Sequence, residues 1–336
     1  MSGPLVVDVF AGAGGLSTGL AMAGFKIALG VERDRDACRS FALSHPGAKV
    51  VESDVSAVVW KLWRRDISVL AGGPPCQPWS SGGKRLGTAD DRDGWPGFLH
   101  ALDELRPAAF VAENVPGFAS SHNFREVVAE MGQLGYTVSS QVVDAADYGV
   151  PQHRRRLVVV GLRTAARQDK EFVFPAPTHG PGAGRPWRTA GEVMGAGPIG
   201  EPNTSVVTYA KHPDLRPGPY DGHLWNGGGR PIDLGRPSRT LLASMGGNKT
   251  PWVDTLGVVP EYHAHLVAGG APRSGPVPGA RRITVEEAAL LQSFPPRTRF
   301  VGSRSSRYRQ VGNAVPPLLA RAIGRALLGQ LEGGEG

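Results

Sequence analysis

ISVLAGGPPCQPWS, residues 67–80, joins a mostly apolar run to a rigid turn that contains a single cysteine. The run Ile67–Ala71 is typical of a buried parallel strand, and the glycines and prolines after it end that strand. Open α/β sheets bind their ligands at the carboxyl ends of their strands, so the position of Cys76 predicts a nucleophile. The alternative for an isolated cysteine is a small buried apolar side chain.

Length and composition limit the class of protein. The chain has 336 residues, of which 40% are hydrophobic, and this predicts one large domain or two unequal ones. No apolar run approaches the roughly 20 residues that span a bilayer, and the first residues lead directly into a strand-like segment, so we expect no membrane span and no signal peptide. Two cysteines make no disulfide framework, which predicts a cytoplasmic protein. No cysteine or histidine spacing indicates a metal site.

The charge balance favours a polyanionic partner. The formal net charge is +7, and the basic residues are 30 arginines and 7 lysines. Arginine binds phosphates and guanine edges in a bidentate manner, which is typical of nucleic-acid binding. Codon usage in a G+C-rich genome is the alternative explanation, and the 47 glycines and 29 prolines fit it equally well. The charge therefore supports a nucleic-acid partner without establishing one.

Residues 1–163 alternate between strand-like and helix-like segments, which predicts an α/β fold with a doubly wound, mostly parallel sheet. The predicted strands are Leu5–Phe10, Lys26–Val31, Val50–Val51, Ile67–Ala71, Ala108–Ala112, Tyr136–Val143 and Arg156–Leu162. The predicted helices are Gly14–Gly24, Asp34–Leu43, Trp95–Leu105 and Phe124–Leu134.

The pattern changes after about residue 164. Residues 175–235 are rich in proline and glycine, yet they keep large aromatic side chains, which favours a small loop-rich domain. Thr284 and Glu287 form a capping-box pattern at the start of a helix, and the last helix is predicted over Pro316–Leu328. We therefore predict a catalytic domain from residues 1–175 and 281–336, and a smaller, irregular, β-rich domain from residues 176–280.

The first strand ends in a glycine-rich turn with the sequence FAGAGG, residues 10–15. Such a turn lets a ligand approach the start of the next helix closely. Glu32 ends the second strand at the distance expected for a carboxylate that binds a ribose, and Asp54 follows the third strand. Ser17 occupies the sixth position of the dinucleotide fingerprint, where glycine is required, so the pattern favours an adenosine ligand without a pyrophosphate. S-adenosylmethionine fits, and ordinary strand–helix turns are the alternative.

Two further motifs lie at predicted strand ends. Glu113 follows the fifth strand, at the same edge of the sheet as Cys76, where a carboxyl group can exchange a proton with a ring nitrogen. Arg154 and Arg156 precede the last strand at alternate positions, and we expect both to face the site. The alternatives are a helix-capping role for Glu113 and a solvated face for the arginines.

With these residues in place, the chain resembles the DNA (cytosine-5) methyltransferases of bacterial type over nearly its whole length. Pro75–Cys76 is similar to the family's nucleophile motif, Glu113–Val115 to its acid motif, and Gln152–Arg156 to the segment that holds the target base. The resemblance implies a thiolate of Cys76 that adds to cytosine C6, and Glu113 and Arg156, with Arg154, as the groups that bind the ring.

The same resemblance implies residues for the cofactor, S-adenosylmethionine. It places Phe10 against the adenine ring, Glu32 on the ribose and Asp54 on the adenine amino group. The other expected contacts are Ala11, Gly12, Gly14, Gly15, Pro74, Asn313 and Ala314. Asn313 and Ala314 belong to the family's final motif, Gly312–Pro316, whose helix returns to the catalytic domain.

For DNA, the resemblance implies a loop over Ser80–Asp93 that closes on the site, with Ser80, Lys84 and Arg85 at the DNA. Arg239 and Gly246 are expected in the recognition region. The implied activity is methyl transfer to C5 of a flipped-out cytosine in a specific duplex sequence, by a monomer, in restriction-modification with a neighbouring endonuclease or in epigenetic marking. Two alternatives remain: a transfer-RNA methyltransferase and an inactive DNA-binding regulator.

Overall fold

A seven-stranded sheet forms the centre of the molecule. The computed structural model describes residues 3–63, 66–75, 93–164, 170–194 and 198–333. The strand order is β3-β2-β1-β4-β5-β7-β6. The strands are β1 (Leu5–Val9), β2 (Lys26–Glu32), β3 (Lys49–Glu52), β4 (Ile67–Gly72), β5 (Ala109–Asn114), β6 (Tyr136–Asp144) and β7 (Arg155–Arg163). All seven predicted strands are present, each within about two residues of its predicted ends.

The sheet is mostly parallel, as the sequence predicts. β1 pairs in parallel with β2 and β4, and the parallel pairing continues to β3 and β5 at either side. β7 is antiparallel to both of its neighbours, β5 and β6. The chain reaches β7 directly from β6, so it enters the sheet from the opposite end and inserts between β5 and the edge strand.

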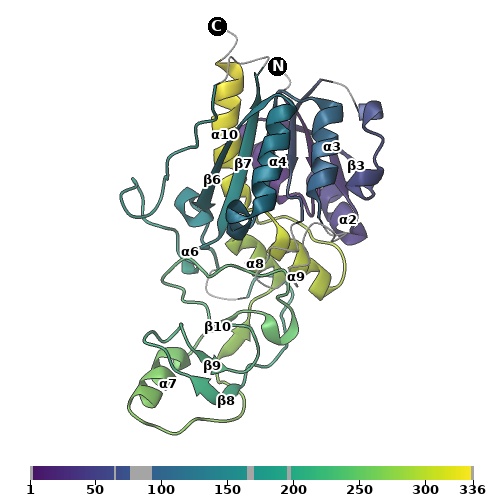
Figure 1. Cartoon of the computed structure of the whole chain (residues 1–336). Coiled ribbons are helices and arrows are strands. Elements are labelled where there is room, and N and C mark those ends of the chain that lie inside the picture. Colours follow the sequence, from purple (N-terminus) through teal and green to yellow (C-terminus); the bar gives the residue numbers. More distant parts are fainter. Residues whose placement is uncertain (1–2, 64–65, 76–92, 165–169, 195–197, 334–336) are drawn as a thin grey trace.

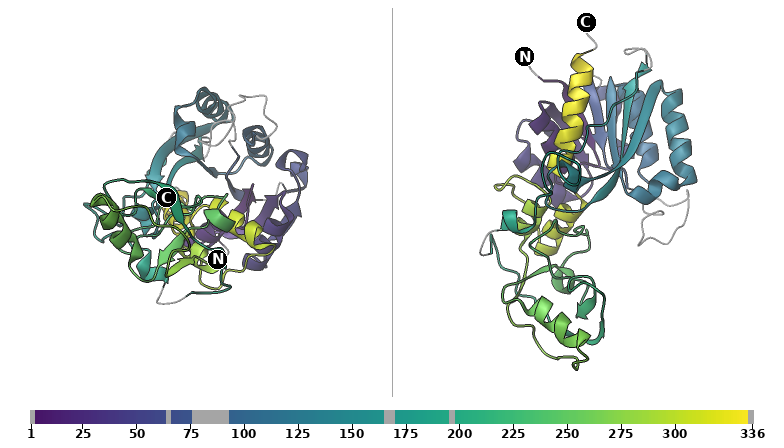
Figure 2. Two further views of the ribbon diagram at one scale, coloured as in Figure 1. Left: turned by 90° about the horizontal axis from the view of Figure 1, so that it is seen from below. Right: turned by 90° about the vertical axis from the view of Figure 1, so that its left-hand side faces the viewer.

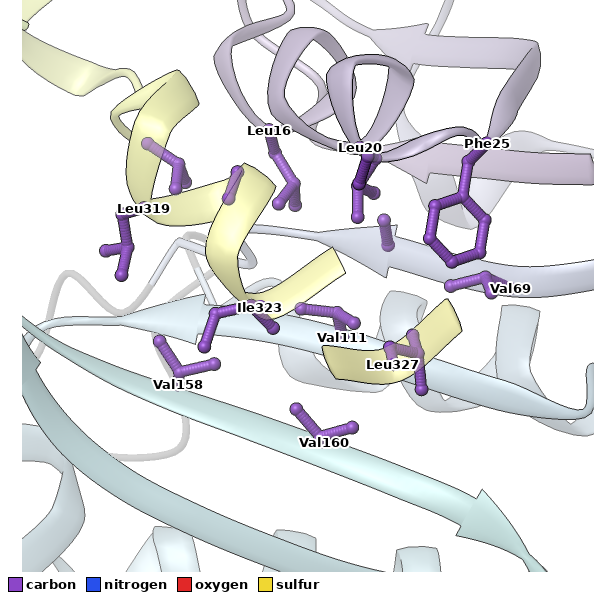
Figure 3. Close-up of a cluster of buried hydrophobic side chains, with 14 of the residues drawn as sticks. Leu16, Leu20, Phe25, Val69, Val111, Val158, Val160, Leu319, Ile323 and Leu327 are labelled. Carbon is purple, nitrogen blue, oxygen red and sulfur yellow. The ribbon is translucent and has the colours of Figure 1, made fainter. Parts of the chain in front are cut away.

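Helices cover both faces of the sheet (Figure 1). They are α1 (Gly15–Ala23), α2 (Arg35–Ser44), α3 (Trp95–Leu105), α4 (His122–Gln133) and α10 (Pro317–Glu332). α1 and α10 pack on one face, where Leu20 and Ile323 contact inward-facing valines of the strands (Figure 3). α3 and α4 pack on the other face, which Phe98 and Phe110 fill. Alternate strand residues point to opposite faces, so both faces of this buried sheet are apolar.

A second, smaller lobe extends from the carboxyl ends of the parallel strands (Figures 1 and 2). Its elements are α6 (Gly191–Met194), β8 (Tyr209–Asp214), β9 (His223–Trp225), β10 (Trp252–Asp254), α7 (Val258–Val267) and β11 (Ala280–Arg282). β8 pairs with β9 and β10 with β11, each antiparallel. Trp225, Trp252 and Tyr262 form its aromatic core. The lobe fits the predicted loop-rich region, although α7 was not predicted.

α8 (Val285–Leu291) and α9 (Arg304–Asn313) lie between the two lobes (Figure 1). The predicted capping box is present at the start of α8, where the Thr284 side chain accepts a hydrogen bond from the Glu287 amide and Glu287 binds back to the Thr284 amide. An apolar cluster that includes Leu241 and Met245 continues into Leu291 and Val311 of these helices. Since packing crosses residue 280 in this way, the domain boundaries at 175 and 280 stay predictions. In the described part of the chain, no helix has the length and apolar character to cross a membrane.

Candidate active site

The carboxyl ends of β4 and β5 meet at the edge of the sheet that faces the second lobe. Gly72 is in register with Ala112, so Glu113 is the next residue beyond this pair. The buried Asn114 donates a hydrogen bond from Nδ2 to the carbonyl oxygen of Pro74 at 3.0 Å. Asn114 therefore fixes the end of β5 to the turn that leads into Cys76. Cys76 itself lies outside the described residues, as do Ser80, Lys84 and Arg85.

Glu113 and Arg156 form an ion pair at this edge. Arg156 Nε lies 2.7 Å from Glu113 Oε1, and each side chain is more than four-fifths buried. The pairing follows from the sheet, because β7 runs antiparallel beside β5 and brings the start of one strand to the end of the other. The two residues that the sequence predicts for this site are thus in contact.

Arg154 is not part of this ion pair, although it lies close enough to interact electrostatically with Arg156 and Glu113. That it binds the target base stays a prediction. Its side chain is 2% exposed and donates to the carbonyl oxygens of Leu241 and Gly312. Arg155, between the two, is exposed, as the alternation predicts. β7 begins at Arg155, and the segment before it follows the residues around Ser238, whose carbonyl accepts from the His153 amide. Burial lowers the pKa of Arg154 to about 9.

The glycine-rich turn joins β1 to α1 in the way the sequence predicts. Phe10, Gly12 and Gly14 have φ of 55°, 54° and 86°, a region that glycine adopts freely and phenylalanine rarely. The Gly14 amide donates to the Ala11 carbonyl, which closes the turn. A Cβ added at Gly12 would contact nothing within 4 Å, so the backbone faces open space there.

Glu32 lies beside this turn at the end of β2. Its Oε2 accepts a hydrogen bond from the Gly12 amide at 2.9 Å, and its Oε1 accepts from the amides of Arg33 and Asp34 at 2.8 Å each. These bonds fix the direction of the carboxylate, and Oε2 keeps a free acceptor site. The structure therefore brings the predicted ribose carboxylate and the predicted turn together.

The remaining predicted cofactor residues surround the same turn. Asp54 is exposed, and hydrogen bonds from the Ser56 side chain and amide lower its pKa. The Phe10 ring packs near Gly94 and Val55, beside Pro75. Across the turn, a Cβ added at Gly15 would collide with the Val315 carbonyl and lie 3.0 Å from Ala314 Cβ, so the segment with Asn313 and Ala314 lies directly against the start of α1.

A buried carboxyl group lies beneath the turn, and the sequence analysis missed it. Asp8 is 1% exposed, and its Oδ2 accepts a 2.6 Å hydrogen bond from Ser17 of α1. Burial raises the pKa of Asp8 to about 7. Two features of the sequence signal this group. Asp8 is a charged residue inside an otherwise apolar strand, and Ser17, its partner, stands where the dinucleotide fingerprint requires glycine.

Arg239 and Gly246 line the region between the lobes, near a hollow of about 570 Å³. Arg239 forms an ion pair with Asp221 at 2.6 Å, and Arg230, Arg236 and Lys249 lie around the same hollow. A Cβ added at Gly246 would lie 3.7 Å from the Ser305 hydroxyl at the start of α9. Within the described ranges, no three His, Cys, Asp or Glu side chains gather as metal ligands would.

Comparisons with known proteins identify the family. A family model described as C-5 cytosine-specific DNA methylase matches residues 5–195 and 247–329. The Type II methyltransferase M.PspPI of Psychrobacter sp. is 33% identical over 97% of this chain and 79% of its own length. The Type II methyltransferase M.AplI of Arthrospira platensis is 33% identical over 98% of this chain and 86% of its own length.

Solved structures share the fold. A DNA modification methyltransferase encoded within a prophage (E. coli) aligns with a TM-score of 0.69 and 24% identity over 98% of this chain and 99% of that chain. Spodoptera frugiperda DNMT2 aligns with a TM-score of 0.69 and 15% identity over 96% and 98% of the two chains. With the family model matching most of its length, the chain belongs to the C-5 cytosine-specific DNA methylase family and is a DNA (cytosine-5) methyltransferase.

Proposed function

We propose that Cys76, Glu113 and Arg156 carry out the addition to cytosine that precedes methylation. The observation that supports this assignment is the Glu113–Arg156 pair at 2.7 Å, held by Asn114 beside the Pro74 turn that leads into Cys76. A thiolate, a carboxyl group and a guanidinium then lie at one edge of the sheet.

The pair matches the polar edge of a cytosine. Cytosine presents an amino donor, the N3 acceptor and the O2 acceptor in a row. The Glu113 carboxyl group binds the amino group and N3, and Arg156 donates to O2. When the Cys76 thiolate adds to C6, negative charge spreads to N3 and O2, and both side chains stabilise it. C5 then becomes enamine-like and nucleophilic.

The cofactor proposal is S-adenosylmethionine, which supplies an electrophilic methyl group when it is bound. The described residues fit such a ligand: the backbone at Gly12 is open, the amides of the turn lie at the start of α1, and Glu32 is oriented beside them. Phe10 and Asp54 would contact the adenine, and Pro74, Asn313 and Ala314 would contact other parts of the same ligand. Loss of the C5 proton and departure of Cys76 complete the reaction on the pyrimidine.

The target base has to leave the helix, because C6 is inaccessible in stacked duplex DNA. Extrusion costs a few kcal/mol, which the contacts of the second lobe with the flanking DNA offset. The basic side chains around the hollow, Arg230, Arg239 and Lys249, are suited to phosphates or guanine edges. We propose that this lobe selects the sequence, that the enzyme acts as a monomer, and that it protects DNA from a partner endonuclease.

Mapping 5-methylcytosine by bisulfite sequencing, in DNA from a host whose only such enzyme is this chain, tests the proposal. We expect methylation of one short sequence, and strongly reduced methylation of it with Glu113→Gln. Parallel incubations of the purified enzyme with duplex DNA and with transfer RNA test the RNA alternative. Methyl incorporation into transfer RNA alone would contradict the proposal, and DNA binding without transfer would support an inactive regulator.

A further inference from the structure

Arg154 is a buried cation that bridges two distant parts of the chain. Its Nη1 donates to the carbonyl oxygen of Leu241 at 3.1 Å, and its Nη2 donates to that of Gly312 at 2.9 Å. Leu241 immediately precedes the loop of residues 242–249. Residues of this loop line the hollow between the lobes. Gly312 is in the last turn of α9, just before Asn313, which ends the helix, and Ala314, its C-cap.

Two glutamines reinforce the same junction. Gln152 is fully buried; its Oε1 accepts from the Leu241 amide at 3.0 Å, and its Nε2 donates to Gln292 Oε1 at 2.7 Å. Gln292, also fully buried, donates onward to the carbonyl oxygens of Val311 and Ala314 at 2.9 and 3.0 Å. The start of the loop and the end of α9 are therefore joined twice, by a guanidinium and by an amide pair.

The backbones at this junction are in direct contact. A Cβ added at Gly312 would lie 2.5 Å from the Leu242 carbonyl oxygen and 2.6 Å from the Ala243 amide nitrogen. On its other side, the segment Ala314–Val315 lies against Gly15 at the start of α1. A continuous stack thus runs from the glycine-rich turn through residues 312–315 to the loop, whose Leu242 is 61% exposed beside Arg239.

Separating the two segments would leave the Arg154 charge buried with only part of its hydrogen bonds. Losing a partner of a buried charge is strongly unfavourable, so the loop and the end of α9 are constrained to move as one body. Burial lowers the pKa of Arg154 because desolvation disfavours the charged form, so the guanidinium depends on its carbonyl partners. A ligand that orders residues 312–315 consequently orders the first residues of the loop.

We propose that Arg154 is a positioning residue that couples cofactor binding to DNA recognition through this junction, an inference that rests on the proposed function of the site. Each ligand then raises the affinity for the other by the same factor, since binding linkage is reciprocal. Arg154 acts through Leu241 and Gly312 and contacts neither ligand. Its role differs from that of Arg156, which lies at the base.

The test measures binding without catalysis. The affinity for a duplex that carries the mapped target sequence is determined with and without S-adenosylhomocysteine. We expect wild type to bind this DNA about 5- to 50-fold more tightly with S-adenosylhomocysteine, a typical range for coupled sites. In Arg154→Met the ratio should fall to within about twofold of unity, while the affinity for S-adenosylhomocysteine alone stays within about threefold of wild type.

Two companion variants make the test specific. Arg155→Met changes the adjacent, exposed arginine and should keep the wild-type ratio. Gly312→Ala pushes the loop backbone away while leaving Arg154 intact, and it should lower the ratio as Arg154→Met does. If Arg154→Met does not fold, Arg154→Lys keeps the buried charge and supplies the comparison.

A folded Arg154 variant with the wild-type ratio would overturn the inference, as would a ratio of one in a wild-type enzyme that methylates DNA. A wild-type protein that binds both ligands with coupling but never transfers a methyl group would instead contradict the proposed function. The two failures are therefore distinguishable.

Discussion

Glu113 and Arg156 belong to β5 and β7, which run in opposite directions. Their ion pair joins one side chain from each strand, so a single substitution removes it. Replacing Glu113 by glutamine keeps the size and removes the group that exchanges a proton with N3. We expect kcat to fall about 10²- to 10⁴-fold, the usual contribution of a positioned acid–base group, with cofactor affinity nearly unchanged. Steady-state methyl transfer and equilibrium cofactor binding measure the two effects.

Glu126→Gln is the matched control, since Glu126 is an exposed carboxylate on α4, away from the sheet edge. It should retain wild-type kcat. A Glu113→Gln enzyme with wild-type kcat would remove Glu113 from the proposed chemistry.

Asp8 makes the stability of the fold depend on pH. Its pKa is raised to about 7 in the folded protein, from an ordinary value of 3.8, so the folded state holds the proton more tightly than the unfolded chain. The stabilising contribution of the protonated form is complete below about pH 4 and is lost as the pH rises through about 7. Asp8→Asn should remove this component of the pH dependence.

Urea unfolding at several pH values measures the contribution of Asp8 to the free energy of unfolding. Between pH 4 and pH 7, the free energy of unfolding of wild type should decrease relative to that of Asp8→Asn by a few kcal/mol. Asp66→Asn, at an exposed position, serves as the control. Parallel curves for wild type and Asp8→Asn would show that Asp8 titrates as an exposed carboxyl group does.

At this scale, the sequence predicted residue types and strand ends better than side-chain directions. Glu32 and Glu113 lie at the carboxyl ends of their strands, so their places were predictable from local pattern. The hydrogen bonds of Arg154 were not predicted, because its partners, the carbonyl oxygens of Leu241 and Gly312, are remote in sequence. Long-range carbonyl partners leave no local signature.

Two glycines show how elements depend on close packing. Gly161 of β7 faces Phe110 of β5, and a Cβ at that position would overlap the aromatic ring. Gly132 lies in α4 with nothing within 4 Å of its added Cβ. We expect Gly161→Ala to lower the free energy of unfolding by about 1–3 kcal/mol through overpacking. Gly132→Ala should raise it by about 0.5–1 kcal/mol through helix propensity.

Both free energies come from urea unfolding of otherwise identical chains. The essential result is that the free energy of unfolding changes in opposite directions, because both variants replace a glycine by alanine. A Gly161→Ala protein as stable as wild type would mean that β5 and β7 are not packed as described.

The elements most accurately predicted are those with local signals. Trp95–Leu105 forms a helix with the predicted ends, and Thr284 with Glu287 forms the predicted capping box. The direction of β7 was not predicted, because parallel and antiparallel strands share the same two-residue period. The short strands of the second lobe also lack a period long enough to be recognised.

At the scale of the whole molecule, the fold places the proposed reaction site between the two lobes. The parallel strands deliver the glycine-rich turn, Glu32 and Glu113 to a single edge, and α8 and α9 connect that edge to the lobe with the basic hollow (Figures 1 and 2). Chain order predicted this edge, since strand ends in a parallel sheet converge. The recognition sequence was not predictable, because base contacts and phosphate contacts use the same side chains.

Trapping with 5-fluorocytosine tests the central claim most directly. Fluorine at C5 blocks the final elimination, so the enzyme should stay covalently bound to a duplex carrying that base at its target position when S-adenosylmethionine is present. We predict an adduct that survives denaturing electrophoresis, maps to the peptide containing Cys76, and is absent in Cys76→Ala. The same adduct in Cys76→Ala, or none in a wild-type enzyme that methylates the unmodified duplex, would contradict the account.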